Sequence, residues 1–181
     1  MKKLKTIKVL TASAIVCAVM LTVPVFAQEK PRLSDAEIAS VAVTANQIDI
    51  EYAQIAQKKS KNSDVLKFAE TMAKDHQAVI DQAVALVTKL GVTPKDNATT
   101  KSFLEGAVKT KAMLNSKKGS AFDKAYIDNE VAYHKAAISE VENVLIPNAT
   151  NSELKSLLES AVPLFKTHLA HAEMVQKEFN K

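Results

Sequence analysis

Long series of apolar residues at steps of three and four dominate this chain and strongly favour a helical fold. The clearest series consists of Val65, Ala69, Met72, His76, Val79, Ala83, Leu86 and Leu90, and similar series occupy residues 127–145 and 154–175. Such steps keep all members of a series on one face of a helix. The chain has three glycines and no Asn-Gly or Asp-Gly hairpin signal, and no strict two-residue alternation persists. The sequence therefore predicts an all-α protein.

The first 27 residues have the pattern of a secretory signal peptide. Four lysines precede an uncharged apolar stretch over residues 9–23, and residues 25–27 supply small side chains for a cleavage site. The apolar stretch is short for a membrane-spanning helix of about 20 residues, so a retained membrane anchor is the less favoured alternative. We expect cleavage after residue 27 and a single helical-bundle domain over residues 28–181, exported to the periplasm or secreted.

The net positive charge of the chain belongs to the predicted signal peptide. That segment holds four of the 24 Lys and Arg residues and none of the 20 Asp and Glu residues, so the mature chain is formally neutral. We therefore expect no nucleic-acid partner and no stable membrane insertion after cleavage. The single cysteine is Cys17, and its loss leaves no disulfide or thiol chemistry. A protein partner cannot be named from the sequence, and homo-oligomerisation stays open.

Capping residues and loop signals predict five helices, over residues 34–58, 63–90, 98–116, 120–146 and 151–179. Ser34 and Glu37 form a capping box at the start of the first helix. Gly91 suits the left-handed position that follows the second helix. Pro163 lies inside the last helix, where a kink or a local bulge is expected.

The lengths of the connections predict how these helices are arranged. Short links join the first helix to the second and the fourth to the fifth, so each pair should form an antiparallel hairpin. The long connection between the second and fourth helices carries the short, weakly amphipathic helix 98–116 and can cross the length of the bundle. This is the connectivity of a ferritin-like four-helix bundle with one crossover. An up-down bundle with a loosely docked fifth helix is the alternative.

All four histidines fall on apolar helix faces near the middle of their helices. Because each residue adds about 1.5 Å to a helix, side chains at similar depth in antiparallel neighbours should meet in one or two layers. Imidazole and carboxylate groups together suit iron, zinc, copper or manganese. The predicted metal ligands are His76, His134, His168, Glu130, Asp49 and Glu51, with Asp75 and His171 as further ligands or as partners that orient the ligands. The alternative is a metal-free polar layer that sets helix register in a structural or interaction protein of the envelope.

Three groups of residues together resemble a known family. The first is Lys67-Phe68-Ala69 with Lys74-Asp75-His76 and the loop 91–94, the second is 121–126 leading to 129–134, and the third is 154–157 leading to Pro163-Leu164-Phe165 and His168. This set is similar to the bacterial exported family called domain of unknown function 4142, over residues 34–178. The resemblance implies a ferritin-like fold without a settled activity. Members are often labelled outer-membrane proteins, a label that the helical pattern does not support.

The resemblance to the wider ferritin-like superfamily implies a comparison with its two-iron centre, which uses a Glu on two helices and Glu-x-x-His on the other two. Ala73, Val131 and Phe165 stand three residues before His76, His134 and His168, so no Glu-x-x-His occurs. A mononuclear site or an unusual dinuclear site is therefore favoured over an oxygen-activating di-iron centre. A ferritin-like redox enzyme remains the third alternative. The chain also has no Gly-x-Ser-x-Gly motif, so the sequence leans away from an enzyme.

Overall fold

The computed structural model describes residues 32–179, so the predicted signal peptide lies outside the described residues. The elements are α1 (Asp35–Lys59), α2 (Ser63–Leu90), α3 (Ala98–Ser116), α4 (Gly119–Glu140), the π-helical segment η1 (Val141–Leu145), α5 (Ile146–Asn148) and α6 (Ser152–Phe179). Residues 32–179 contain no strand, which confirms the all-α prediction. Within the same range, no helix combines the length and the apolar character needed to cross a bilayer.

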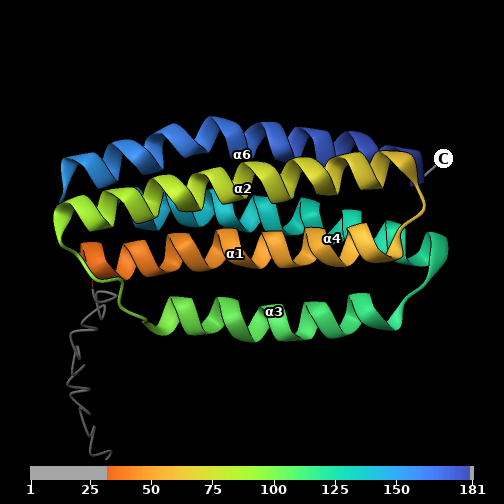
Figure 1. Ribbon diagram of the computed structural model, residues 1–181, viewed down its shortest axis with the longest axis horizontal. Helices are drawn as coiled ribbons and strands as arrows, with labels where there is room; N and C mark the ends of the chain where they lie inside the picture. The colour runs from red at the N-terminus through yellow and green to blue at the C-terminus, as the bar shows by residue number, and fades with distance from the viewer. Residues whose placement is uncertain (1–31, 180–181) are drawn as a thin grey trace, which may run out of the picture. The chain divides into compact units, whose positions relative to one another are not determined.

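α1, α2, α4 and α6 form a four-helix bundle, and α3 lies along its side (Figure 1). Around the bundle, α1 packs against α2, α2 against α6, α6 against α4, and α4 against α1. α3 runs back along the bundle and packs on α1 and α4, so α2 and α4 start at the same end and run parallel (Figure 1). This long crossover gives the predicted ferritin-like connectivity and excludes the up-down alternative.

The helix ends follow from local hydrogen bonding. In the capping box of α1, the Ser34 backbone N–H donates to Glu37 Oε2 at 3.0 Å, and Ser34 Oγ accepts from the Glu37 backbone N–H at 3.4 Å. The Asn62 side chain accepts from backbone N–H groups at the start of α2. α2 ends at Gly91, whose φ of 64° is left-handed. The observed helix ends lie within about two residues of the predicted ones, as capping chemistry leads one to expect.

Two apolar clusters fill the bundle, one on each side of a polar layer. The cluster around Phe68, Met72 and Tyr126 occupies one half, and the cluster around Ile38, Leu145 and Leu158 occupies the other. His76, His134 and His168 are buried between these two clusters on α2, α4 and α6, and the buried Asp49 follows Ile48 at the edge of the first cluster on α1. The core therefore places polar groups from four helices at the same depth.

The bulge expected at Pro163 is absent, because α6 is α-helical from Ser152 to Phe179. Pro163 and Glu159 are both exposed, so the Glu159 carbonyl that loses its helical N–H partner can be satisfied by water. The irregular backbone lies instead at η1, where α4 widens into a π-helix before α5. The local bulge, one of the two alternatives predicted at Pro163, is therefore wrong for α6, and the kink stays a prediction.

Candidate metal centre

Five ionisable side chains meet at mid-bundle, contributed by all four bundle helices. Asp49 comes from α1, His76 from α2, Glu130 and His134 from α4, and His168 from α6, and each is at most 4 % exposed. The ring centroids of the three histidines lie 5.1–5.6 Å apart. We call these five residues the polar cluster.

The distances between potential ligand atoms suit a single metal ion. One nitrogen from each of the three histidines lies within 4.8 Å of the other two, and a second group of this kind combines Asp49, Glu130 and His134. Asp49 Oδ2 lies 3.6 Å from His76 Nε2 and 3.8 Å from His134 Nε2. A tetrahedral ion with bonds of about 2.0–2.1 Å holds its ligand atoms about 3.4 Å apart. Small side-chain rotations would therefore bring these atoms to coordination distance.

His76 is oriented by a hydrogen bond on the ring nitrogen opposite to Asp49. Its Nδ1 lies 2.6 Å from Asn46 Oδ1. The Asn46 amide is itself fixed, because its Nδ2 donates to the Ala42 carbonyl at 2.8 Å, which leaves Oδ1 to accept. Nδ1 of His76 is thus the protonated nitrogen, and Nε2 carries the free lone pair near Asp49.

His134 and His168 are anchored in the same manner by different acceptors. His134 Nδ1 donates to the Glu130 backbone carbonyl at 3.0 Å, and His168 Nε2 donates to Asp75 Oδ2 at 3.0 Å. The opposite nitrogens have no hydrogen-bond partner: Nε2 of His76, Nε2 of His134 and Nδ1 of His168. A histidine that binds a metal ion almost always donates its other N–H to a carbonyl or a carboxylate. All three rings show that arrangement.

Burial keeps the three imidazoles neutral. It lowers the pKa of His76 well below its ordinary value, and the neighbouring His134 and His168 lower it further. Burial lowers the pKa of His134 to about 4. It also lowers the pKa of His168, although the hydrogen bond to Asp75 acts in the opposite direction. Neutral imidazole is the form that binds metal ions, so no proton needs to leave these rings.

Asp49 and Glu130 form a buried carboxyl pair. Burial raises the pKa of Asp49 to about 7, and the neighbouring Glu130 carboxyl opposes that shift. Burial also raises the pKa of Glu130 well above its usual range, and the charge of Asp49 adds to the effect. The nearby Tyr126 hydroxyl is also buried and has no hydrogen-bond partner. Ionised carboxylates are costly in such surroundings, and a divalent cation would offset that cost.

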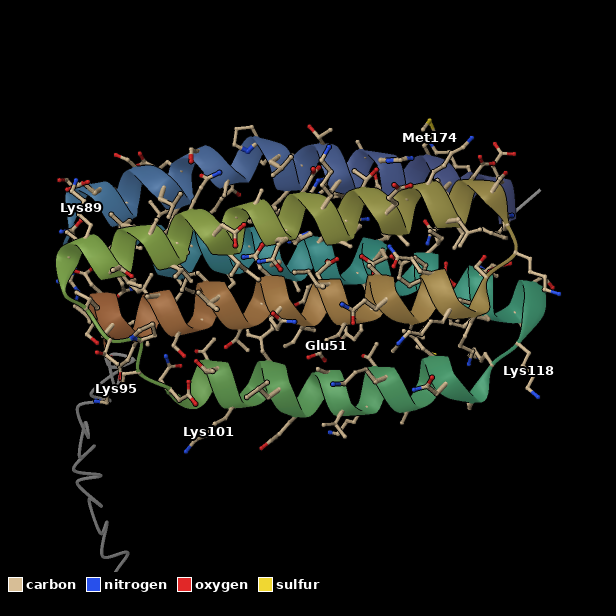
Figure 2. All side chains as sticks on the ribbon, in the orientation of Figure 1. Glu51, Lys89, Lys95, Lys101, Lys118 and Met174 are labelled. Atoms are coloured by element: carbon tan, nitrogen blue, oxygen red, sulfur yellow. The ribbon has the colours of Figure 1, made fainter. Side chains whose placement is uncertain are left out.

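The other predicted site residues lie at the border of this cluster or outside it. Asp75 is 31 % exposed and contacts the cluster through His168. Glu51 lies on the side of α1 that faces α3, with its Oε2 2.6 Å from Lys111 Nζ (Figure 2). His171 packs edge-on against the Phe68 ring, with centroids 5.1 Å apart. The structure therefore does not bring Glu51 and His171 together with the other predicted ligands.

Sequence reasoning missed Asn46 and placed Asp49 at the flank of an apolar face. Both side chains are buried, at 6 % and 0 % exposure. The chain does contain a signal for Asp49, because Ala45, Asp49 and Tyr52 follow one another at steps of four and three. Asn46 precedes Asp49 by three residues, one helical turn away. Two polar residues one turn apart within an apolar face are the pattern that could have identified Asn46.

Fold and site together define the class: a ferritin-like helical bundle with a buried layer of three histidines and two carboxyl groups. The family model of DUF4142, a domain of unknown function, matches residues 22–175. The chain belongs to this family, in agreement with the motif resemblance.

Two solved structures share this fold. A DUF305 protein from Streptomyces coelicolor, described by its name as a candidate secreted protein, has a TM-score of 0.68 at 12% identity; the match covers 81% of this chain and 93% of that one. CopM in the Cu(II)-bound form has a TM-score of 0.60 at 16% identity, with 81% of this chain and 98% of that one covered. At such low identity the likeness establishes the fold alone. No curated protein matches the chain significantly.

Proposed function

We propose that this DUF4142 protein is an exported helical bundle that binds a divalent transition-metal ion in the polar cluster. The ligands would be His76 Nε2, His134 Nε2, His168 Nδ1 and the Asp49 carboxylate. The observation that carries this proposal is the shared state of the three rings: one nitrogen of each is anchored, and the opposite, buried nitrogen has no partner. Buried polar atoms without partners are rare in folded proteins, and a metal ion would satisfy all three at once.

The ligand chemistry narrows the choice among iron, zinc, copper and manganese. Three imidazoles and one carboxylate suit zinc, copper and iron better than manganese, which prefers oxygen ligands. CopM shares the fold and has been solved with Cu(II), so Cu(II) is the first ion to test. Glu130 is a further buried carboxyl of the cluster, with Oε2 3.6 Å from His134 Nδ1. Glu130 could hold a proton beside Asp49 or could bind a second metal ion. The number of metal ions per chain distinguishes these alternatives.

The metal content of the native protein tests the proposal directly. We expect the protein purified from its own compartment without a histidine tag to contain about one transition-metal ion per chain. The double variant His76→Gln/His134→Gln should lose it. His171→Gln is the matched control, because that histidine lies outside the polar cluster, and it should keep the metal. Native protein without metal, which also fails to bind added Cu(II) and Zn(II), would overturn the proposal. Unchanged melting after chelation would then favour the structural alternative.

Export is proposed from the leader pattern of residues 1–27. Mass spectrometry of the native protein should show a mature chain that starts at Gln28. A chain that retains Met1 would contradict cleavage and would favour the membrane-anchor alternative.

A further inference from the structure

A partly open cavity of about 50 Å³ adjoins the polar cluster. Asp49, His76 and His134 line the part next to the cluster, and the remaining walls are almost entirely apolar. These walls belong to the half of the bundle that contains the start of α1, η1 and the start of α6. Much of the lining consists of alanines: Ala39, Ala42, Ala45, Ala83, Ala137 and Ala161.

The π-helical segment η1 and the turn of α6 that contains Pro163 border this cavity. Val141 and Leu145, the first and last residues of η1, line it. Ala161 and Phe165, on either side of Pro163 in α6, line it as well. Protein interiors are close-packed, with few voids larger than a water molecule, and π-helical segments often occur at functional sites. The coincidence of a void, a π-helix and a helical proline beside a buried polar cluster points to a ligand pocket.

The size and chemistry of the cavity restrict its occupant. A water molecule takes about 30 Å³ of liquid volume, and benzene has been held in an apolar cavity of about 150 Å³. At about a third of the volume that holds benzene, the space beside the cluster is too small for an aromatic ring and suits a molecule of a few heavy atoms. Apolar cavities stay dry and bind apolar guests, whereas a charged ligand would be left unsolvated there.

We propose that the cavity binds a small uncharged apolar molecule, of the size of a diatomic gas, directly beside the metal ion. Phe165 stacks on the His76 ring, with centroids 5.4 Å apart and planes at 10°, and both side chains line the cavity. The placement beside a metal ion rests on the proposed function. The capacity of the cavity for an apolar guest does not depend on the proposed function, because the residues that line the cavity are present without a metal.

Xenon is the probe for the first experiment, because it is an uncharged atom that enters small apolar cavities. With metal-free protein, the xenon NMR shift should change with protein concentration, and Ala137→Leu should remove most of that change by filling the cavity. Ala136→Leu is the matched control: this neighbouring side chain is exposed and does not line the cavity. Equal shifts for the native protein and Ala137→Leu would overturn the proposal. If Ala137→Leu does not fold, Ala161→Leu with Ser160→Leu as its exposed control replaces the pair.

The second experiment tests whether the guest lies beside the metal. Cu(II) is paramagnetic and Zn(II) is not, so bound xenon should relax faster in Cu(II)-loaded than in Zn(II)-loaded protein once unbound metal is removed. The difference should disappear in Ala137→Leu. Equal relaxation in both loaded forms would overturn the placement beside the ion. If neither ion binds, the proposed function and the placement both fail, and the metal-free experiment alone decides whether the cavity holds a guest.

Discussion

Asp49 and Glu130 are the residues of this bundle whose protonation should change when a metal binds. Because burial raises the pKa of both carboxyl groups, to about 7 for Asp49, the metal-free protein holds protons there near neutral pH. Coordination needs the Asp49 carboxylate, so binding should release protons and metal affinity should rise with pH through about 7. The histidines are already neutral and contribute no proton.

Isothermal titration calorimetry measures this release, through binding enthalpies in two buffers of equal pH and different ionisation enthalpy. Asp49→Asn should reduce the number of protons released. Glu51 lies two residues after Asp49 on α1 and pairs with Lys111, so Glu51→Gln should leave the number of released protons unchanged. Binding enthalpies that are identical in both buffers would contradict the expected release.

Asn46 should act on the metal through His76. Asn46→Ala removes the acceptor of His76 Nδ1–H, so the ring loses both its orientation and its preferred tautomer. Loss of such a partner typically weakens metal binding about 10–100-fold. The exposed neighbour Gln47 supplies the control variant Gln47→Ala. Titration against a competing chelator measures both affinities, and an unchanged affinity in Asn46→Ala would show that the hydrogen bond does not orient the ligand.

At the scale of the elements, helix boundaries were predictable because their causes are local. The capping box of Ser34 and Glu37 and the left-handed Gly91 act within one helical turn, so the sequence displays them directly. The meeting of His76, His134 and His168 followed from similar depth on regular helices. The direction in which each side chain points around the helix axis was harder to predict from the sequence. That direction distinguishes the buried Asp49 from the more exposed Glu51.

The remaining differences arise from tertiary packing. η1 is not encoded by a proline or a glycine within Val141–Leu145, and it lies where α4 borders the cavity. Pro163 removes one backbone hydrogen bond from α6. Because this site is exposed, water can take the place of the missing N–H, and no bulge forms. The spacing of Asn46 and Asp49 within α1 marks Asn46 as a polar residue on an apolar face, but its partner His76 lies on another helix, so its role depends on tertiary packing.

Two glycines of the described region should respond in opposite directions to alanine. Gly91→Ala should destabilise the protein by about 1 kcal/mol, because its φ of 64° is unfavourable for a residue with a Cβ. Gly106→Ala should stabilise it by up to about 1 kcal/mol, since alanine is the better helix former. Neither new Cβ would meet an atom within 4 Å, so the backbone alone decides the sign. Urea unfolding measures both, and a shift of the same sign in the two variants would refute this argument.

At the scale of the whole molecule, the buried carboxyl should appear in the pH dependence of unfolding. The pKa of Asp49 is raised from 3.8 to about 7 in the folded protein. Between these values the folded state keeps a proton on Asp49 that the unfolded state has lost, so the contribution of Asp49 to the stability of the metal-free protein falls as pH rises through this window. Asp49→Asn cannot titrate, and its stability relative to the native protein should rise by a few kcal/mol between about pH 4 and pH 8.

Urea unfolding in the presence of a chelator, at both pH values, provides the measurement. Gln47→Ala serves as the control, because Gln47 is exposed and has no ionisable group, and its offset from the native protein should be nearly the same at both pH values. An Asp49→Asn offset that does not vary with pH would show that the Asp49 carboxyl is ionised to the same extent in the folded and unfolded chain.

The proposed ligands come from four helices, and the last of them in the sequence, His168, lies on α6. A chain still threading through an export channel cannot assemble such a centre, because sites of this kind rarely exist before folding. For an exported chain, loading would wait until α6 has emerged and docked. The ion acquired would then reflect the metals available outside the cytoplasm. The compartment in which folding finishes would therefore influence which metal is bound as much as the ligands do.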